Sequence, residues 1–150
     1  MSGDEDYLRE AIAEANAAER CGEVPVGAII VCNGEIIARG RNRVIAEQDP
    51  TAHAEIVALR AAGRALGNYR LEGCDLYTTL EPCAMCAGAI LHARIRRLIF
   101  AAADPKAGAC GTVLQVLNHP ALNHRVKVTA GLLAEECGAL LSSFFRARRG

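Results

Sequence analysis

The stretch DLYTTLEPCAMCAGAILHARIRRLIFA, residues 75–101, decides the fold of this sequence. Asp75 to Leu80 is typical of a short strand, and Arg96 to Ala101 repeats the strand pattern. Cys83 to Ala93 lies between them and is helical in pattern, with Pro82 expected as its first helical residue. Strands joined by a helix in one sheet run parallel, because the crossover returns the chain to the end where it started. The stretch therefore predicts an α/β fold.

The segments on either side extend this pattern with apolar residues at helical or alternating spacing. Asn33-Gly34 suits the two-residue type I′ turn of a hairpin, and the segment from Asp104 to Gly111 is a glycine-containing loop. In chain order we expect a helix over about 5–20, strands over 24–32 and 35–41, a helix over about 52–66, the three elements of residues 75–101, a short helix ending at residue 117, a strand over 126–130 and a helix over about 132–146. This order predicts a single domain, residues 1–150, with a three-layer α/β/α architecture and about five strands in a mixed sheet.

Length and composition agree with one ordinary globular domain. The chain has 150 residues, of which 51% are hydrophobic and 23% charged. No apolar run approaches the ~18 residues of a membrane span, and the first residues are acidic where a secretory signal would be basic. The seven cysteines are an odd number, which argues against a disulfide framework and leaves metal-binding or core roles. We therefore expect a cytoplasmic protein with no membrane partner.

The charges are balanced in number but not in position. Seventeen basic residues match seventeen acidic ones, yet the first 35 residues hold eight acids and two arginines. The remainder of the chain therefore carries 15 basic residues (17 − 2) and 9 acidic ones (17 − 8). This asymmetry permits a polyanionic partner on one face without demonstrating one.

Two short motifs carry candidate metal ligands, and each lies at a predicted helix start. Cys83 and Cys86 are three residues apart, so both sulfurs face one side of a helix whose positive end favours thiolates. His53, at the start of the helix over 52–66, can add a nitrogen ligand. Ligands of such sheets bind outside the carboxyl ends of strands, where both helices begin. One His and two Cys leave a fourth position of Zn²⁺ open, which is typical of a catalytic zinc.

Glu55 lies two residues beyond His53 and can reach a zinc-bound water without binding the metal. Zinc lowers the pKa of such a water to about 7, and a neighbouring carboxylate can then move its proton. The combined pattern H-x-E followed by P-C-x-x-C is the signature of zinc-dependent nucleobase deaminases. The predicted chemistry is hydrolytic deamination, with Glu55 as the catalytic residue.

Other interpretations of the motifs stay open at this point. A structural zinc would need a fourth protein ligand, for which the candidates are Cys74, His92, Cys110, His119 and His124. A deaminase of the same type acting on guanine, a cytidine derivative or a pyrimidine precursor of riboflavin would carry the same motif. A zinc-stabilised RNA-binding module without catalysis is a third interpretation, although the carboxylate of Glu55 beside an open zinc position would then have no purpose.

From about Tyr7 to Arg149, the sequence resembles the bacterial tRNA-specific adenosine deaminases. The segments that carry the resemblance are EVPVGAIIV (23–31), DPTAHAEIVALR (49–60), NYRL (68–71), TLEPCAMCAGAI (79–90), NHRV (123–126) and FFRARR (144–149). The resemblance implies the cytidine deaminase-like fold, a homodimer, one Zn²⁺ per subunit on His53, Cys83 and Cys86, and Glu55 as proton shuttle. It also implies that the substrate is a tRNA anticodon stem-loop whose wobble adenosine becomes inosine.

The resemblance further implies substrate-binding residues outside the zinc motif. Asn42 should hydrogen-bond the flipped nucleoside, and Val26 and Ala54 should line the base pocket. Six more positions match residues near the bound anticodon loop: Asp104, His119, Asn123, Phe144, Arg148 and Arg149. Taken alone, each has an ordinary structural interpretation, such as core packing for Val26 and Phe144 or turn capping for Asp104.

Overall fold

The computed structural model describes residues 3–149. In chain order its elements are α1 (Asp4–Arg20), β1 (Gly27–Cys32), β2 (Glu35–Arg41), α2 (Ala54–Leu66), β3 (Cys74–Leu80), α3 (Ala84–Ala93), β4 (Arg97–Ala102), β5 (Lys127–Ala130) and α4 (Ala134–Arg149). The sheet order is β2-β1-β3-β4-β5. None of the described helices is both long and apolar enough to cross a membrane.

The sheet is mixed, as the sequence predicts. β1 pairs antiparallel with both β2 and β3, whereas β3–β4 and β4–β5 are parallel. The β1–β2 turn has positive φ at Asn33 (52°) and Gly34 (77°), which confirms the type I′ geometry. Because β1 runs against both neighbours, the carboxyl ends of β2 and β3 lie at the same end of the sheet. The segments that follow these two strands therefore meet there.

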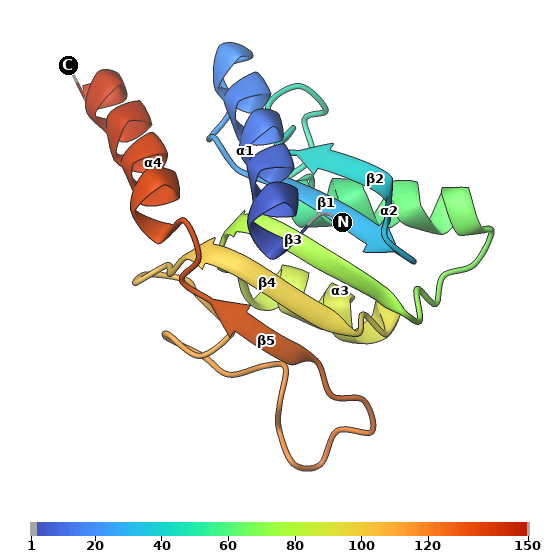
Figure 1. Cartoon of the computed structure of the whole chain (residues 1–150). Coiled ribbons are helices and arrows are strands. Elements are labelled where there is room, and N and C mark those ends of the chain that lie inside the picture. Colours follow the sequence, from blue (N-terminus) through green and yellow to red (C-terminus); the bar gives the residue numbers. More distant parts are fainter. Residues whose placement is uncertain (1–2, 150) are drawn as a thin grey trace.

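Helices cover both faces of the sheet and complete the three-layer α/β/α fold (Figure 1). α1 and α4 lie on one face, where buried side chains such as Leu8, Ile99 and Cys137 form one apolar cluster. α2 and α3 lie on the other face, over a larger cluster that includes Ala58, Leu76 and Ile90. The predicted architecture is confirmed. The helical layer formed by α2 and α3 carries both metal-binding motifs.

α2 lies unusually close to the sheet because β2 has a glycine beneath it. A Cβ atom at Gly40 would overlap the carbonyl oxygen of Ala54 and lie 2.6 Å from the backbone nitrogen of Ala58. Any side chain here would push the helix away from the sheet. Gly40 thus determines how close the start of α2, with His53 and Glu55, lies to the sheet.

Four details of the predicted secondary structure are wrong. The first strand begins at Gly27 rather than at residue 24, because Pro25 has no amide hydrogen to donate to a sheet. Residues 111–117 form turns and an isolated bridge between Cys110 and Gln115 instead of a short helix. The amides of Val113, Leu114 and Val116 donate to the carbonyls of residues 108 and 109 instead of to the carbonyls four residues earlier, so no helical ladder forms. The other two errors concern helix starts: α3 begins at Ala84 rather than at Pro82, and α2 at Ala54 rather than at residue 52.

We predict that Gly40→Ala lowers the free energy of unfolding by about 2 kcal/mol, because the added methyl group overpacks the interface between α2 and β2. Urea unfolding measures the loss. Gly63→Ala, in α2 itself, is the matched control: its Cβ meets nothing closer than 3.5 Å, and alanine is the better helix former. Equal stability of the two variants would contradict the close-approach argument.

Candidate metal centre and active site

The three predicted metal ligands occupy the first positions of two helices. His53 is the N-cap of α2 and Cys83 the N-cap of α3, both with extended backbone, and Cys86 follows in the first turn of α3. An N-cap side chain points back across the helix start, where unpaired amide hydrogens create a positive potential. The two helix starts therefore face one another with a thiolate-stabilising field between them.

The distances between the donor atoms fit zinc. Nδ1 of His53 lies 3.6 Å from Sγ of Cys83 and 3.6 Å from Sγ of Cys86. Tetrahedral zinc bonds of about 2.3 Å to sulfur and 2.0–2.1 Å to nitrogen require a nitrogen–sulfur separation of about 3.6 Å. The geometry also selects Nδ1 as the ligand atom of His53. Within residues 3–149 these three side chains form the only cluster of such donors, so no fourth protein ligand closes the site.

The protonation of the two thiols also favours a cation. Hydrogen bonds from the Cys86 thiol and from His53 lower the pKa of Cys83 to about 3, so Cys83 carries a negative charge. The hydrogen bond to Cys83 in turn raises the pKa of His53. The pKa of Cys86 is raised because its proton is held by the Cys83 sulfur and because it is buried. A cation that displaces this proton frees both sulfurs as ligands.

Glu55 is the buried acid of the site. It is 4% exposed and lies in the first turn of α2, two residues after His53. Burial raises the pKa of its carboxyl group to about 7, against the opposing effects of its own backbone amide and of His53. A carboxyl group with this pKa can both accept and return a proton near neutral pH.

A cavity of about 870 Å³ opens beside the zinc ligands. His53, Glu55 and Cys83 line it, together with the predicted pocket residues Val26, Asn42 and Ala54. Oδ1 of Asn42 is buried and is the one such side-chain atom in the described chain that lacks a hydrogen-bond partner. An unpaired buried acceptor is costly unless something else supplies a donor. The structure thus brings the predicted nucleoside-binding residues together with the predicted catalytic ones.

The residues expected to contact the anticodon loop are distributed differently. Asp104 lines the cavity. His119 and Asn123 are exposed in the turns before β5. Phe144 is buried, whereas its neighbour Phe145 lines the cavity together with Arg146.

Arg148 is not among the residues that line the cavity. Arg148 stacks over the ring of Phe144 at 4.5 Å and donates a hydrogen bond to the carbonyl of Gly22. Arg149 ends α4, and its side chain lies outside the described part of the structure. α4 instead lines the cavity with Leu141, Ser142, Phe145 and Arg146, which the sequence argument did not single out as site residues.

Two buried carboxylates that shape the cavity were missed by sequence reasoning. Glu81, 2% exposed, accepts hydrogen bonds from the backbone of Asp104, Cys110 and Thr112 and from the Thr112 hydroxyl, and so holds one wall of the cavity. Glu23 accepts from the backbone of residues 45 and 46 and holds the loop that follows Asn42. The available signal was an acid within an apolar stretch beside a motif, but the sequence does not reveal its partners.

We predict that Cys83→Ala loses most of its zinc, since two ligands cannot hold the ion as three do. Elemental analysis of the purified protein measures the metal content. Cys21→Ala is the control, because Cys21 is exposed and lies outside the donor cluster. A full zinc content in the Cys83 variant would refute the ligand assignment.

Comparison with known proteins agrees with this site. A family model described as the cytidine and deoxycytidylate deaminase zinc-binding region matches residues 1–102. A tRNA-specific adenosine deaminase of Bacillus subtilis is 52% identical over 149 residues, covering 99% of this chain and 92% of the relative. A protein of the same name from Aquifex aeolicus is 50% identical and covers 98% of this chain and 97% of its own.

Solved structures give the same result. A structure from studies of A-to-I editing by tRNA:A34 deaminases at the wobble position superposes with a TM-score of 0.87 and 47% identity, over 90% of this chain and 98% of its own. Guanine deaminase from Nitrosomonas europaea superposes with a TM-score of 0.80 at 28% identity, over 96% of this chain and 85% of its own. Together with the zinc-fitting geometry, these matches show that the chain belongs to the zinc-dependent cytidine and deoxycytidylate deaminase family and, within it, to the tRNA-specific adenosine deaminases.

Proposed function

We propose that this protein deaminates the wobble adenosine of a tRNA anticodon to inosine and releases ammonia. The observation that carries the proposal is the buried carboxyl group of Glu55, placed beside a three-donor zinc site in a cavity that contains the unpaired oxygen of Asn42. The close relatives are named for this reaction, and the guanine deaminases are more distant in sequence.

The residues of the site supply binding and proton transfer. An adenosine in a single-stranded loop can turn into the cavity without the few kcal/mol needed to open a duplex. When bound, zinc supplies an activated water at neutral pH. As the oxygen of the water bonds to C6 of the adenine, Glu55 would take one proton from that water and deliver it to ring N1. Glu55 would then carry the second proton from the new hydroxyl group to the 6-amino group, whose bond to C6 breaks, so one water is consumed and one ammonia released. Its raised pKa, about 7, suits both directions of transfer.

The rim of the cavity suits the rest of the loop. Asn42 can accept a hydrogen bond from the flipped nucleoside, and Val26 and Ala54 can pack against it. Lys106 and Arg146 add positive charge at the rim, where phosphates of an anticodon loop would pass. The contacts proposed for Asp104, His119, Asn123, Phe144, Arg148 and Arg149 complete the expected RNA surface.

We also propose that the chain acts as a homodimer. α3 carries no Asp, Glu, Lys or Arg, and its side away from the core exposes Ala84 and Met85, the latter at 36%. A helix that is apolar on all sides is normally buried on all sides, so a second subunit is the expected cover. Residues 1–150 form one domain in this proposal, and the protein acts in the cytoplasm, where its tRNA substrate occurs. The seven free cysteines agree with this location, because thiols stay reduced in the cytoplasm.

We expect the wild-type protein to produce inosine from an anticodon stem-loop with adenosine at the wobble position. Glu55→Ala should keep its zinc and lose roughly 10²–10⁴-fold in kcat, the range for a general acid–base group. Inosine is quantified after nuclease digestion, and zinc by elemental analysis. A variant with near wild-type turnover would exclude Glu55 as proton shuttle. Ammonia release from free guanine or cytidine, with no inosine from RNA, would instead indicate a small-substrate deaminase.

The dimer has a separate test. Sedimentation of the wild-type protein at micromolar concentration should give the mass of two chains, and Ala89→Glu should give one, because a charge on the outer side of α3 cannot be paired there. Ala13→Glu, at an exposed position of α1, is the matched control and should remain dimeric. A monomeric wild-type protein would contradict the proposed interface.

A further inference from the structure

A second pocket lies at the opposite end of the sheet from the zinc site. It has a volume of about 470 Å³ and is formed where β3 and β4 begin, by residues of three separate segments: Arg70, Glu72, Gly73, Arg94, Arg96, His124 and Arg125. Cys83 follows the other end of β3, a strand of seven residues that spans roughly 23 Å at 3.3 Å per residue. The pocket is thus separate from the cavity in which deamination is proposed to occur.

The pocket is strongly basic. Four arginines line it, and Glu72 is its single acidic residue. Among the described residues, the ion pairs at the pocket engage Arg70, with Glu72 at 3.7 Å, and Arg96, with the buried Asp75 at 2.8 Å. None engages Arg94, and Arg125 donates only to backbone carbonyls. A surplus of positive charge therefore faces solvent here.

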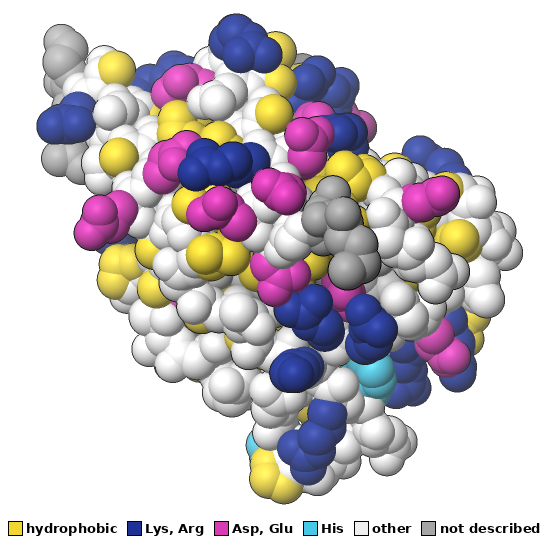
Figure 2. All heavy atoms as spheres, in the orientation of Figure 1, with side chains coloured by type: hydrophobic (Ala, Val, Ile, Leu, Met, Phe, Trp, Pro, Cys, Tyr) yellow, Lys and Arg dark blue, Asp and Glu magenta, His cyan; other side chains and the backbone are white. Residues whose placement is uncertain are grey.

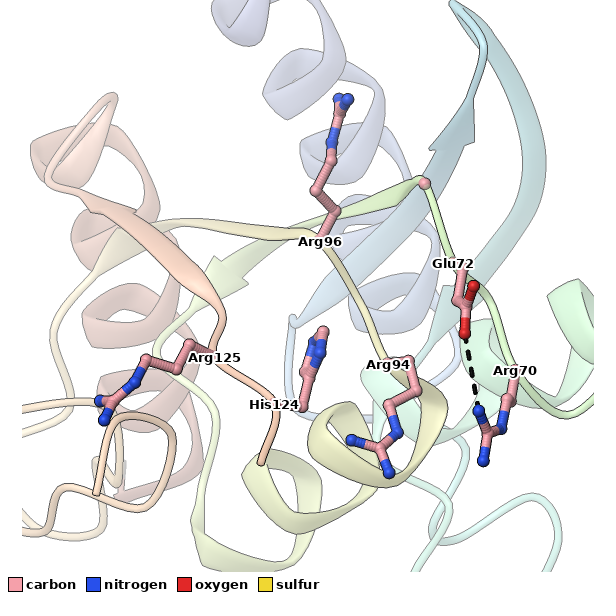
Figure 3. A pocket seen from close by; sticks show the side chains of 7 residues that line it. Arg70, Glu72, Arg94, Arg96, His124 and Arg125 are labelled. Atoms are coloured by element: carbon pink, nitrogen blue, oxygen red, sulfur yellow. Dashed lines mark ion pairs between the residues drawn. The ribbon is translucent and has the colours of Figure 1, made fainter. Parts of the chain in front are cut away.

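The arrangement of these side chains indicates the shape of the ligand. Figure 3 shows Arg70 and Arg94 extending in the same direction from neighbouring segments, while Arg125 points away from them on the far side of His124. Nε2 of His124 lies 2.7 Å from the carbonyl oxygen of Ile95, which fixes the ring between them. The cationic groups are spread along the pocket instead of converging on one point. Such spacing suits a row of phosphates better than a single small anion.

The rest of the surface supports an extended ligand. Figure 2 shows Lys and Arg side chains gathered around the end of the sheet where β4 and β5 begin, and Asp and Glu side chains gathered over α1. The acidic and basic residues, which are distributed unevenly along the sequence, are therefore also separated on the folded surface. Arginine is the residue that best combines charge with directed hydrogen bonds to phosphate oxygens.

We infer that this pocket binds the phosphate backbone of the tRNA at a distance from the nucleoside in the zinc cavity. The inference rests on the proposed tRNA substrate. The contacts are independent of base identity, because phosphates carry no direct sequence information, so they add affinity and leave the chemistry at Glu55 unchanged.

The test is binding of the zinc-loaded protein to two full-length tRNAs, one with adenosine and one with guanosine at the wobble position. Arg70→Gln/Arg94→Gln should weaken binding to both by the same roughly tenfold factor and reduce the slope of log Kd against log salt by about 2. KM for the adenosine tRNA should rise, and kcat at saturating RNA should stay as in the wild type. Arg9→Gln/Arg20→Gln, which removes the same charge from α1, is the control and should change neither quantity.

Binding equal to that of the control would overturn the inference, and so would a fall in kcat, which would indicate a structural role. Binding of inorganic pyrophosphate in the absence of RNA, lost in the Arg70/Arg94 variant while tRNA binding stays as in the wild type, would assign the pocket to a small anion instead. The guanosine tRNA cannot be converted, so its binding reports on this pocket even if the wild-type protein makes no inosine. That last result would reject the proposed function and not the RNA contact.

Discussion

His53 and Cys83 can share a metal because the two strands that precede them end at the same end of the sheet. β1 runs antiparallel to both β2 and β3, so the loops that follow β2 and β3 converge. Each loop then places its ligand at the N-cap of a helix, and the glycine at position 40 lets α2 approach closely enough for a nitrogen–sulfur distance of 3.6 Å. Strand direction, helix start and helix height must all be correct before this donor set exists.

Three glutamates near the cavity are buried, but their surroundings give two of them a structural role and one a role in proton transfer. Glu81 accepts four hydrogen bonds from the 104–112 loop, and Glu23 accepts two from the 45–46 loop. Their charges are satisfied by fixed donors, which suits a structural role. The carboxyl group of Glu55 meets its own backbone amide, and burial raises its pKa to about 7. The least satisfied carboxylate of the three is therefore the one that is able to exchange protons.

The sequence predicted what depends on local pattern. Hydrophobic periodicity located all nine elements of the described chain, and ligand spacing identified His53, Cys83 and Cys86. It did not predict the turns over 111–117, because this loop is held by Glu81, about 30 residues earlier, which accepts from the amides of Cys110 and Thr112. The local sequence also could not predict that the side-chain oxygen of Asn42 is buried without a partner. Only the resemblance to a known family indicated a role for that residue. Contacts between distant segments have no signature within either segment.

The net charge is zero, but the charged side chains are distributed unevenly over the surface. Much of the acid on α1 is already engaged: Asp4 pairs with Arg97, Glu10 and Glu14 pair with Arg39. Those pairs fix α1 on the sheet and use basic residues that would otherwise face solvent. Arg94 and Arg125 are among the described arginines that have no such partner, and both line the pocket where β3 and β4 begin. The net charge of zero is therefore the sum of two unlike regions, one rich in Asp and Glu over α1 and one rich in Lys and Arg where β4 and β5 begin.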